Sequence, residues 1–521
     1  MITLINIIVS VVERRKIVAK INTLWHSKSK IENFIRPNSK FDAQYRTYKK
    51  AYEEHTLIDD KTWSDLNLET FFYKINFNFT VIGEIKLYAT LRGMFKIGNT
   101  SLIQMFTNNQ HFRLNVSYIL SKVCKSVYPL FPDQLEPIKH NHSLMFCPLL
   151  PFLSLIFIFT IPANGLLIFL GIILLNVVLS LKLKKSYDQD LKSIFYTANV
   201  IKQCLSLSKM EGTPNLNVNF NHFKTSRHFS RLLSRVESQD MLSSTIMLLK
   251  LIFMVDYVLF HLIQRNYFKY QEEIMSCYDY ISTLDNHYSL ALYRSTLDTY
   301  CEPEISNCKK GVYFQNLKHP LIDEDIAIAN DLDISKNILL TGSNASGKST
   351  FMKAVALNLI MSQNLHTTTA SSFKCHSVYV ITSMANADDV LSGNSYFMAE
   401  LKSIRRLFNI HSKEMIYCFI DEIFKGTNTT ERIAASESVL SFLYHTPNYK
   451  VIAATHDIEL STILKKKYLN YYFNESIQNN QIFFDYKIKL GKANTRNAIE
   501  LLRITHFPDQ IYKRAKENVS D

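Results

Sequence analysis

The chain carries glycine, lysine and serine residues at a spacing that could bind phosphate. Four residues separate Gly342 from the run Gly347-Lys348-Ser349. In such a loop the glycines let backbone N–H groups face phosphate oxygens, the lysine reaches the outer phosphates, and the serine hydroxyl ligates Mg²⁺. A strand-like run precedes the loop and a helix-like run follows it, whose N-terminus also favours anions. The predicted nucleotide-binding residues are Gly342, Ser343, Asn344, Ala345, Ser346, Gly347, Lys348, Ser349 and Thr350.

Two carboxylates and a histidine follow apolar runs downstream. Asp421 and Glu422 end the run MIYCFIDE, and His456 ends KVIAATH. Asp421, with Ser349, would hold the Mg²⁺ ion, directly or through water. Glu422 would orient or deprotonate the attacking water, and His456 would sense or stabilise the γ-phosphate. Lys348, Glu422 and His456 are therefore the catalytic candidates, against the simpler reading of a solvated strand end and a structural histidine.

A third stretch lies between these motifs. Ser392-Gly393-Asn394-Ser395 precedes a predicted helix. The first turn of that helix could bind an anion. Taken alone, the stretch is a capped helix start and nothing more.

A parallel sheet is needed to bring these residues together. After Gly311, the short apolar runs NILLTG, SVYVIT, MIYCFIDE and KVIAATH alternate with helical stretches. Such runs suit buried strands of an α/β sheet. Residues 13–140 and 186–300 instead have the long polar–apolar patterns of helices. A chain of 521 residues exceeds one ordinary core, so several structural units are expected.

A long apolar segment, which we call the greasy segment, interrupts the helical region. Ser143–Leu181 contains no charged residue, and a Pro162-Ala163-Asn164-Gly165 turn divides it. One bilayer crossing needs about 20 apolar residues, so the segment predicts two short spans in a hairpin. Lysines on both sides place both ends, and the phosphate loop, in the cytoplasm of a two-span membrane protein. The alternative is a buried helical hairpin in a soluble core.

A second apolar stretch, Met241–Ile263, contains Lys250 and Asp256. Charges in the middle of a span are costly, and a single third span would put the phosphate loop outside the cell. This stretch is therefore predicted to be a buried helix. The sequence therefore predicts four parts. They are a helical N-terminus with the first part of the core (1–140), a transmembrane hairpin (141–183), a helical core or lever domain (184–310) and an α/β P-loop ATPase domain (311–521).

The net charge indicates the kind of binding partner, and the cysteine pattern indicates the redox state of the thiols. The 59 basic and 46 acidic residues give a net charge of +13, which favours an anionic partner such as nucleic acid or an acidic membrane surface. The eight cysteines form no CxxC pair and no zinc set, and they are expected to be reduced thiols.

Taken in order, the motifs resemble the MutS family of DNA mismatch repair ATPases. TGSNASGKSTFMK, SYFMAEL, FIDEIFKGTNT and ATHDIEL are similar to its phosphate-loop, STFM-x-E, DE-x-GRGT and ATH-x-x-EL segments. LKHPLI resembles the segment that opens the ATPase domain, and the stretch from Leu490 to Glu517 resembles the one that closes it. More weakly, Thr62–Arg92 and Tyr278–Arg294 resemble the two ends of the helical core domain. The whole arrangement looks like a membrane-associated MutS-like branch.

The resemblance implies ATP and Mg²⁺ as cofactors and a homodimer with composite sites. It places Asn344 on the phosphates and Ser395 on the γ-phosphate of the partner subunit. DNA is implied as a partner, but the chain shows no N-terminal mismatch-reading domain. The family's adenine-stacking aromatic would fall near Ala327, where none stands, and Phe424-Lys425 replace the usual Gly-Arg.

The predicted function is a membrane-anchored MutS-like ATPase whose ATP cycle drives a dimeric clamp. One alternative is an ABC-type transport-associated ATPase, because Leu391-Ser392-Gly393 resembles its signature beside a membrane segment. Another is a non-catalytic, nucleotide-sensing membrane scaffold. The intact Asp421-Glu422 pair favours catalysis over the scaffold.

Overall fold

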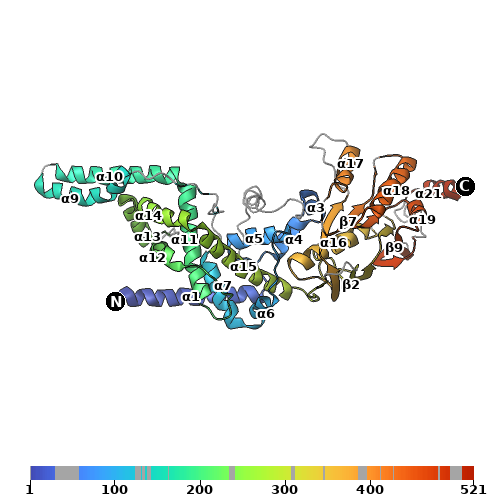
Figure 1. The fold of residues 1–521 in the computed structure, drawn as a ribbon, viewed down its shortest axis with the longest axis horizontal. Coiled ribbons are helices and arrows are strands. Elements are labelled where there is room, and N and C mark those ends of the chain that lie inside the picture. Colours follow the sequence, from blue (N-terminus) through green and yellow to red (C-terminus); the bar gives the residue numbers. More distant parts are fainter. Residues whose placement is uncertain are drawn as a thin grey trace. The chain divides into compact units, whose positions relative to one another are not determined.

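The chain forms two compact units in the computed structural model (Figure 1). We call them the helical unit (Met1–Thr47, Phe77–Lys86 and Ser101–Leu292) and the sheet unit (Tyr48–Asn76, Leu87–Thr100 and Tyr293–Asp521). The structure describes residues 2–29, 58–123, 131, 135, 137, 142–161, 164–233, 241–306, 311–343, 346–384, 396–410, 412, 414–425, 427–478, 481–492 and 507–520.

The described residues of the helical unit form helices joined by short connections, which confirms the helical texture predicted for this region. Its elements, of which α5, α6 and α15 share residues with the sheet unit, are α1 (Ile2–His26), α5 (Val81–Leu91), α6 (Thr100–Asn108), α7 (Gln110–Val123), α8 (His142–Phe146), η3 (Cys147–Leu149), α9 (Leu150–Thr160), α10 (Gly165–Ser186), α11 (Asp188–Ser208), η4 (Phe220–Phe223), α12 (Lys224–Leu233), α13 (Met241–Ile252), α14 (Val255–Lys269) and α15 (Gln271–Ser295).

A buried carboxylate organises the core of the helical unit. Asp285 of α15 is fully buried and accepts hydrogen bonds from the backbone N–H groups of Phe79 (2.9 Å) and Thr80 (2.8 Å) and from the Thr80 hydroxyl (2.6 Å). A Cβ atom at Gly83 would lie 2.3 Å from Asp285 Oδ2, so only glycine fits beside it. This network fixes the start of α5 against α15, because each buried polar group must keep its partner.

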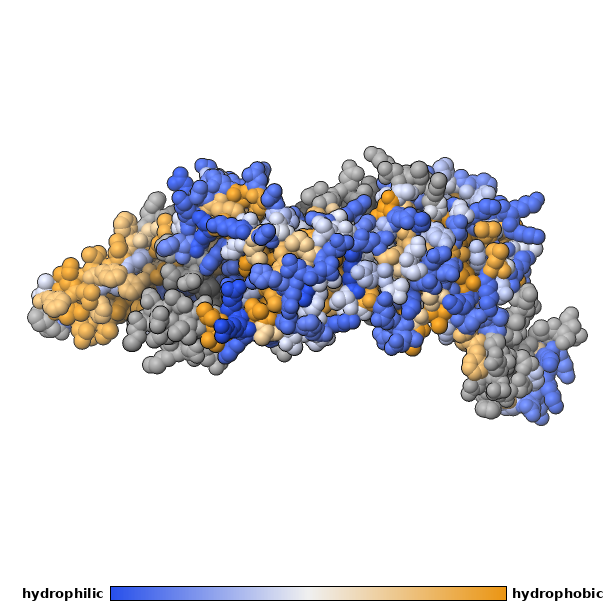
Figure 2. Space-filling view, turned by 90° about the horizontal axis from the view of Figure 1, so that it is seen from below, coloured by the Kyte–Doolittle hydropathy of each residue, from blue (hydrophilic) through white to orange (hydrophobic). Residues whose placement is uncertain are grey.

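The greasy segment forms an antiparallel hairpin of α9 and α10 whose surface is apolar (Figures 1 and 2). Among the described residues, Gly165–Ser186 is the one single helix long and apolar enough to cross a membrane, and the run Leu144–Thr160 is shorter. Pro148 and Pro151 divide that run into α8, η3 and α9, since proline lacks a backbone N–H. The predicted hairpin is thus present, but only one of its two arms is long enough to cross a membrane as a single helix.

The prediction of one buried helix over Met241–Ile263 is wrong. The stretch forms α13 and part of α14, which meet at a 71° bend, and Met254 between them has φ +45°. α14 is largely buried, whereas Leu248 of α13 is 53% exposed. Lys250 and Asp256, whose charges argued against a membrane span, form an ion pair across the bend. The Lys250 Nζ atom lies 3.0 Å from Asp256 Oδ1.

The sheet unit contains a six-stranded sheet in the order β10-β9-β4-β8-β7-β6. The four predicted strands are β4 (Ile338–Thr341), β6 (Val378–Ser383), β7 (Met415–Asp421) and β8 (Tyr449–Ala454), which run parallel to one another. Sequence reasoning missed the hairpin of β9 (Leu469–Gln478) and β10 (Gln481–Leu490), which extends the sheet next to β4. The predicted α/β P-loop architecture is confirmed for this sheet.

A second sheet and several helices complete the sheet unit. β1 (Glu304–Ser306), β2 (Val312–Leu317), β3 (Asn330–Ile334) and β5 (Ser372–His376) form a four-stranded sheet in the order β1-β5-β2-β3. The helices are α3 (Asp60–Asp65), α4 (Leu68–Ile75), α16 (Lys348–Asn364), α17 (Tyr396–Arg406), α18 (Thr429–His445), α19 (Ile458–Ile463) and α21 (Asp509–Ser520).

Candidate nucleotide-binding site

Three neighbouring strands end at the same level of the six-stranded sheet. Ala454 of β8 pairs with Leu340 of β4 on one side and with Asp421 of β7 on the other. The phosphate loop follows β4, Glu422 follows β7, and His456 follows β8. The register of the sheet therefore brings the three predicted motifs together at the carboxyl edge, where α/β sheets bind ligands.

The phosphate loop has the backbone geometry that its glycines permit. Gly342 has φ +143° and Gly347 has φ +106°, in the region that side chains disfavour. Gly347 caps α16, whose first residue is Lys348. Lys348 Nζ donates to the carbonyl oxygens of Gly342 and Ser343, at 2.8 Å each. The loop's own carbonyl groups thus hold the lysine that the sequence assigns to the phosphates.

A carboxylate that sequence reasoning missed touches this loop. Glu475 of β9 is 6% exposed and accepts a hydrogen bond from the Ser343 hydroxyl. Ser343 stands where the resembling family has proline, which has no hydroxyl to donate. The contact therefore depends on the hydroxyl of Ser343, and only the pairing of β9 with β4 could have revealed it.

Asp421 has the environment expected of a Mg²⁺ ligand. Its Oδ1 atom is buried and has no hydrogen-bond partner among the described residues. The same is true of Ser346 Oγ in the loop. A buried oxygen without a partner costs free energy unless an ion, water or ligand satisfies it. Carboxylate and hydroxyl oxygens are the ligands that Mg²⁺ prefers, so Asp421 and Ser349 fit the predicted metal role.

Glu422 is held between two basic side chains. One carboxylate oxygen pairs with Lys425 Nζ and the other with His456 Nε2. Its side chain is 11% exposed, so little water screens these pairs. Its φ of +54° is uncommon outside glycine, and such strain occurs preferentially at functional sites. To accept a proton from water, the carboxylate must be at least partly released from these partners.

His456 bridges Glu422 and the phosphate loop. Its Nδ1 lies 3.1 Å from the Gly342 carbonyl oxygen, while Nε2 faces Glu422. Partial desolvation of the ring, followed by the charges of Lys348 and Lys425, lowers the pKa of His456 below its usual 6.5. A neutral imidazole donates one hydrogen bond, although two acceptors face it. A negative phosphate nearby would favour protonation and let the ring donate to both sides.

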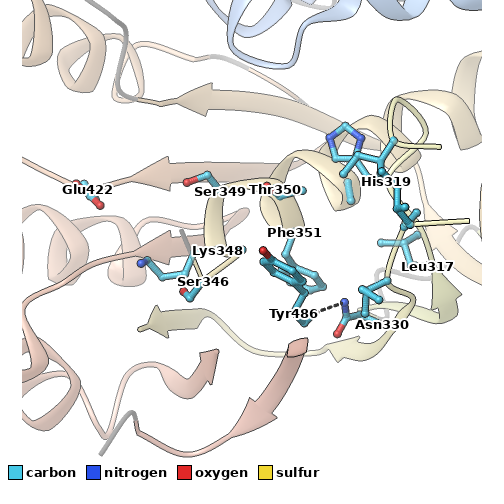
Figure 3. Close-up of a pocket in the computed structure, with 16 residues that line it drawn as sticks. Leu317, His319, Asn330, Ser346, Lys348, Ser349, Thr350, Phe351, Glu422 and Tyr486 are labelled. Carbon is cyan, nitrogen blue, oxygen red and sulfur yellow. Dashed lines mark hydrogen bonds between the residues drawn. The ribbon is translucent and has the colours of Figure 1, made fainter. Parts of the chain in front are cut away.

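A cavity of about 500 Å³ opens beside the loop. Figure 3 shows Ser346 and Lys348 toward one end, Leu317 and His319 toward the other, and the aromatic rings between them. The lining residues are Leu317, His319, Ile322, Ile326, Ala327, Ile328, Asn330, Ser346, Gly347, Lys348, Ser349, Thr350, Phe351, Ala354, Glu422 and Tyr486. The polar loop end and the apolar far end suit a ligand with phosphates and a flat apolar group.

Tyr486 supplies an aromatic ring that the sequence did not predict. It lies in an irregularity of β10, where the pairing with β9 shifts between Phe484 and Ile488, and its φ is +51°. Asn330 holds this bulge by donating to the Tyr486 carbonyl oxygen (3.0 Å) and accepting from the Ile488 N–H (2.9 Å). A Cβ atom at Gly347 would lie 2.9 Å from the Tyr486 ring, so the ring closely covers the loop.

Some predicted site residues lie outside the part of the chain that the structure describes. These are Asn344 and Ala345 of the phosphate loop and Ser395, together with the whole segment 385–395. Their predicted roles stay predictions. α17 begins at Tyr396, immediately after that segment, as the sequence predicts.

Nucleotide affinity is expected to fall above pH 8. Burial lowers the pKa of Lys348 to about 8, against the opposing effect of the Asp421 charge. Bound phosphate would raise this pKa again, so binding takes up a proton once the free lysine is neutral, and affinity drops by up to about tenfold per pH unit above pH 8. Calorimetric titration between pH 7 and 9.5 measures this. Lys348→Gln should bind weakly with a flatter profile, and a flat wild-type profile would contradict the assignment.

Phe424 occupies a backbone conformation that suits glycine. Its φ is +61°, and the resembling family has glycine at this position. The ring is nevertheless 6% exposed, and it packs among the buried side chains around β7, β8 and α18. Burying a phenylalanine contributes roughly 2–3 kcal/mol, which offsets a left-handed backbone cost of roughly 1–2 kcal/mol.

Phe424→Gly is therefore expected to be about 1 kcal/mol more stable than Phe424→Ala, because both lose the ring and only glycine relieves the strain. Urea unfolding of the purified variants measures the difference. Phe442, 60% exposed within α18, is the matched control, since there alanine should be the more stable by about 1 kcal/mol. If alanine were more stable than glycine at position 424 as well as at position 442, the backbone at Phe424 would be unstrained.

Comparison with known proteins agrees with this site. Residues 338–521 match the family model MutS domain V. The chain is 32% identical to the DNA mismatch repair protein MutS of Clostridium kluyveri over 254 residues, covering 46% of this chain and 28% of that protein. It is 27% identical to that of Staphylococcus haemolyticus over 277 residues, covering 50% and 30%.

The similarity thus covers about half of this chain and less than a third of those relatives. It includes the phosphate loop, the Asp421-Glu422 pair and His456, whose convergence the fold shows independently. Through residues 338–521, the chain is similar to the MutS family.

Proposed function

We propose that the chain hydrolyses ATP at this site and uses the cycle to open and close a membrane-anchored homodimer. The single observation that carries the proposal is the alignment of the ends of β4, β7 and β8, which brings Lys348, Glu422 and His456 to one edge. Asp421 Oδ1, which has no hydrogen-bond partner in the described part of the chain, supports a metal-assisted reaction. The relatives named MutS support the same assignment.

In this mechanism, water attacks the γ-phosphorus, the bond to the bridging oxygen breaks, and Glu422 takes the proton released by the water. Lys348 leaves the loop carbonyl oxygens and balances phosphate charge, while His456 donates to the γ-phosphate oxygen. Mg²⁺, held by Ser349 and Asp421, would supply further charge neutralisation when bound. Tyr486 and the apolar end of the cavity would receive the adenine ring.

Phosphate release by the detergent-purified chain tests the proposal. Lys348→Ala is expected to abolish ATP turnover, because no other side chain replaces its charge at the loop. Lys336→Ala removes one positive charge outside the cavity of the same unit and should leave turnover unchanged. Equal turnover in Lys348→Ala and the wild type would refute the site.

Two other outcomes point to the alternative functions. Tight ATP binding without turnover in the wild type would identify a nucleotide-sensing scaffold. ATP-dependent uptake of solute into vesicles would identify a transport-associated ATPase. Neither outcome is expected, because the site contains an intact carboxylate pair and the chain has few helices able to cross a membrane among its described residues.

DNA is the partner that the net charge of +13 and the MutS relatives favour. Binding to duplex DNA should weaken steeply as salt increases, since phosphate contacts release counterions. Mismatched duplex is expected to bind no more tightly than perfect duplex. A clear preference for mismatches would contradict this, and no binding at low salt would exclude DNA as the partner.

The α9–α10 hairpin is the proposed membrane anchor. Apolar side chains such as Phe159 (83% exposed) and Leu167 (68% exposed) cover it, and no neighbouring described element buries them. Lys184 and Lys185 lie in the last turn of α10, as expected at a cytoplasmic membrane surface. The proposed organisation keeps the four predicted parts, with the anchor at 141–183 and the ATPase domain at 311–521.

A further inference from the structure

α13 exposes an apolar surface that no described element covers. Met247, Leu248 and Leu249 are 52%, 53% and 48% exposed. Three consecutive residues span roughly 200° around a helix, so more than one narrow stripe is apolar. A helix lying on a water-exposed surface places polar side chains over such an arc.

A buried asparagine joins α13 to the hairpin. Asn176 of α10 is fully buried, and its Nδ2 donates to the carbonyl oxygens of Cys147 (2.8 Å) and Ile252 (3.0 Å). Cys147 begins the η3 break before α9, and Ile252 is the last residue of α13. Ile252 ends α13, where its carbonyl group lacks a regular helical partner. The Cys147 carbonyl group also accepts from the Leu150 N–H within η3. Asn176 therefore fixes both segments to α10.

Aromatic packing continues this junction. Phe152 of α9 and Phe253, which directly follows α13, stack with ring centroids 4.9 Å apart. Phe152 is itself 58% exposed, so the exposed apolar surface of the hairpin begins beside the end of α13. The space-filling view in Figure 2 shows this surface as one hydrophobic region over the hairpin end.

The charges near α13 are arranged for a lipid surface. Lys250, the only charged residue of α13, pairs with Asp256, and the two side chains are 14% and 22% exposed. The exposed stretch from Ser244 to Leu249 carries no charge. At the end of α10, Lys182, Lys184 and Lys185 supply cations that suit anionic headgroups.

Resting on the proposed anchoring of the hairpin, we propose that α13 is a third membrane-contacting helix, clamped to the hairpin by Asn176 and seated among the acyl chains of one leaflet of an anionic bilayer. α13 has 12 residues, or about 18 Å of helix, which is too short to cross a core of about 30 Å. The 71° bend then directs α14 into the buried core of the helical unit.

Bromolipid quenching of introduced tryptophans tests the proposal. The full chain is reconstituted with vesicles of phosphatidylcholine and phosphatidylglycerol, with or without bromine on the acyl chains. Leu248→Trp reports on α13, Leu167→Trp on the hairpin, and Glu211→Trp on an exposed turn as the control. The native Trp25 and Trp63 give a constant background. Bromine is expected to quench the tryptophans at 248 and 167 several-fold more than the one at 211.

The outcomes separate this inference from the anchoring itself. Quenching at 167 without quenching at 248 overturns the inference and leaves the anchor standing. No quenching at either position, with no flotation of the wild type with vesicles, overturns both. A blue-shifted but unquenched tryptophan at 248 means that protein, such as a second copy of the chain, covers α13, and it also overturns the lipid assignment.

Asn176→Leu tests the clamp. Combined with Leu248→Trp, it should reduce the quenching at 248, because α13 loses its tie to α10. Combined with Leu167→Trp, it should leave the quenching at 167 unchanged, which shows that the hairpin still inserts. Unchanged quenching at 248 would show that Asn176 does not position α13.

Discussion

Glu422→Gln is expected to lower ATP turnover by about 100-fold or more while ATP still binds. The amide keeps the size of the side chain but cannot take a proton from water, and general-base catalysis contributes about 10²–10⁴-fold. The phosphate loop, Lys348 and Asp421 are untouched, so the affinity for ATP should stay within a few fold. Single-turnover hydrolysis and filter binding of labelled ATP measure the two quantities separately.

The matched control is a glutamate at the other end of the same strand, β7. Glu414 immediately precedes β7, whereas Glu422 immediately follows it. Glu414→Gln removes the same charge from the opposite end of the strand and should hydrolyse ATP normally. If Glu422→Gln retained turnover within about threefold of the wild type, another group would have to activate the water, and the assignment of Glu422 would be wrong.

Replacing Leu167, Leu170 and Leu174 with lysine is expected to release the chain from membranes. These residues lie on one side of α10 and are 68%, 51% and 65% exposed. Leu174 lies near the middle of α10, where a lysine costs about 2.5–3.5 kcal/mol, and the lysines at 167 and 170 add to this cost. Fractionation of expressing cells into membrane and supernatant, followed by alkaline extraction of the membranes, measures the change.

The triple variant could also change fraction because it aggregates. Its control is therefore a second triple variant that adds the same number of lysines elsewhere. Ile326, Phe442 and Leu490 are exposed apolar residues of the sheet unit, and lysine at all three should leave the chain in the membrane fraction. A wild-type chain that remains in the supernatant without detergent would show that the hairpin does not anchor it. ATP binding by the released variant would show that the sheet unit remains folded.

The catalytic edge could be predicted from sequence because its signals are local. The runs around Leu340, Phe419 and Ile452 are apolar on both faces, as central parallel strands must be, and each ends in a residue with chemistry. The phosphate loop adds glycines whose spacing has a direct backbone meaning. Parallel strands then place such ends together without further information.

The remaining residues of the site depend on pairings that no local pattern contains. Glu475 and Tyr486 reach the phosphate loop only because β9 pairs with β4 and because a bulge redirects β10. Likewise, the sequence of α13 cannot reveal that Lys250 and Asp256 neutralise each other across a bend. Pairing between distant strands decided the first two cases, and a bend between two consecutive helices decided the third; the sequence pattern contains neither.

Asn176 also orders the events of synthesis. Its second acceptor, the carbonyl of Ile252, lies 76 residues further along the chain. The ribosome therefore exposes the complete hairpin well before α13 exists. During that interval the apolar helices α9 and α10 must be shielded from water without the help of α13. α13 can pack against α10 only after it has been synthesised.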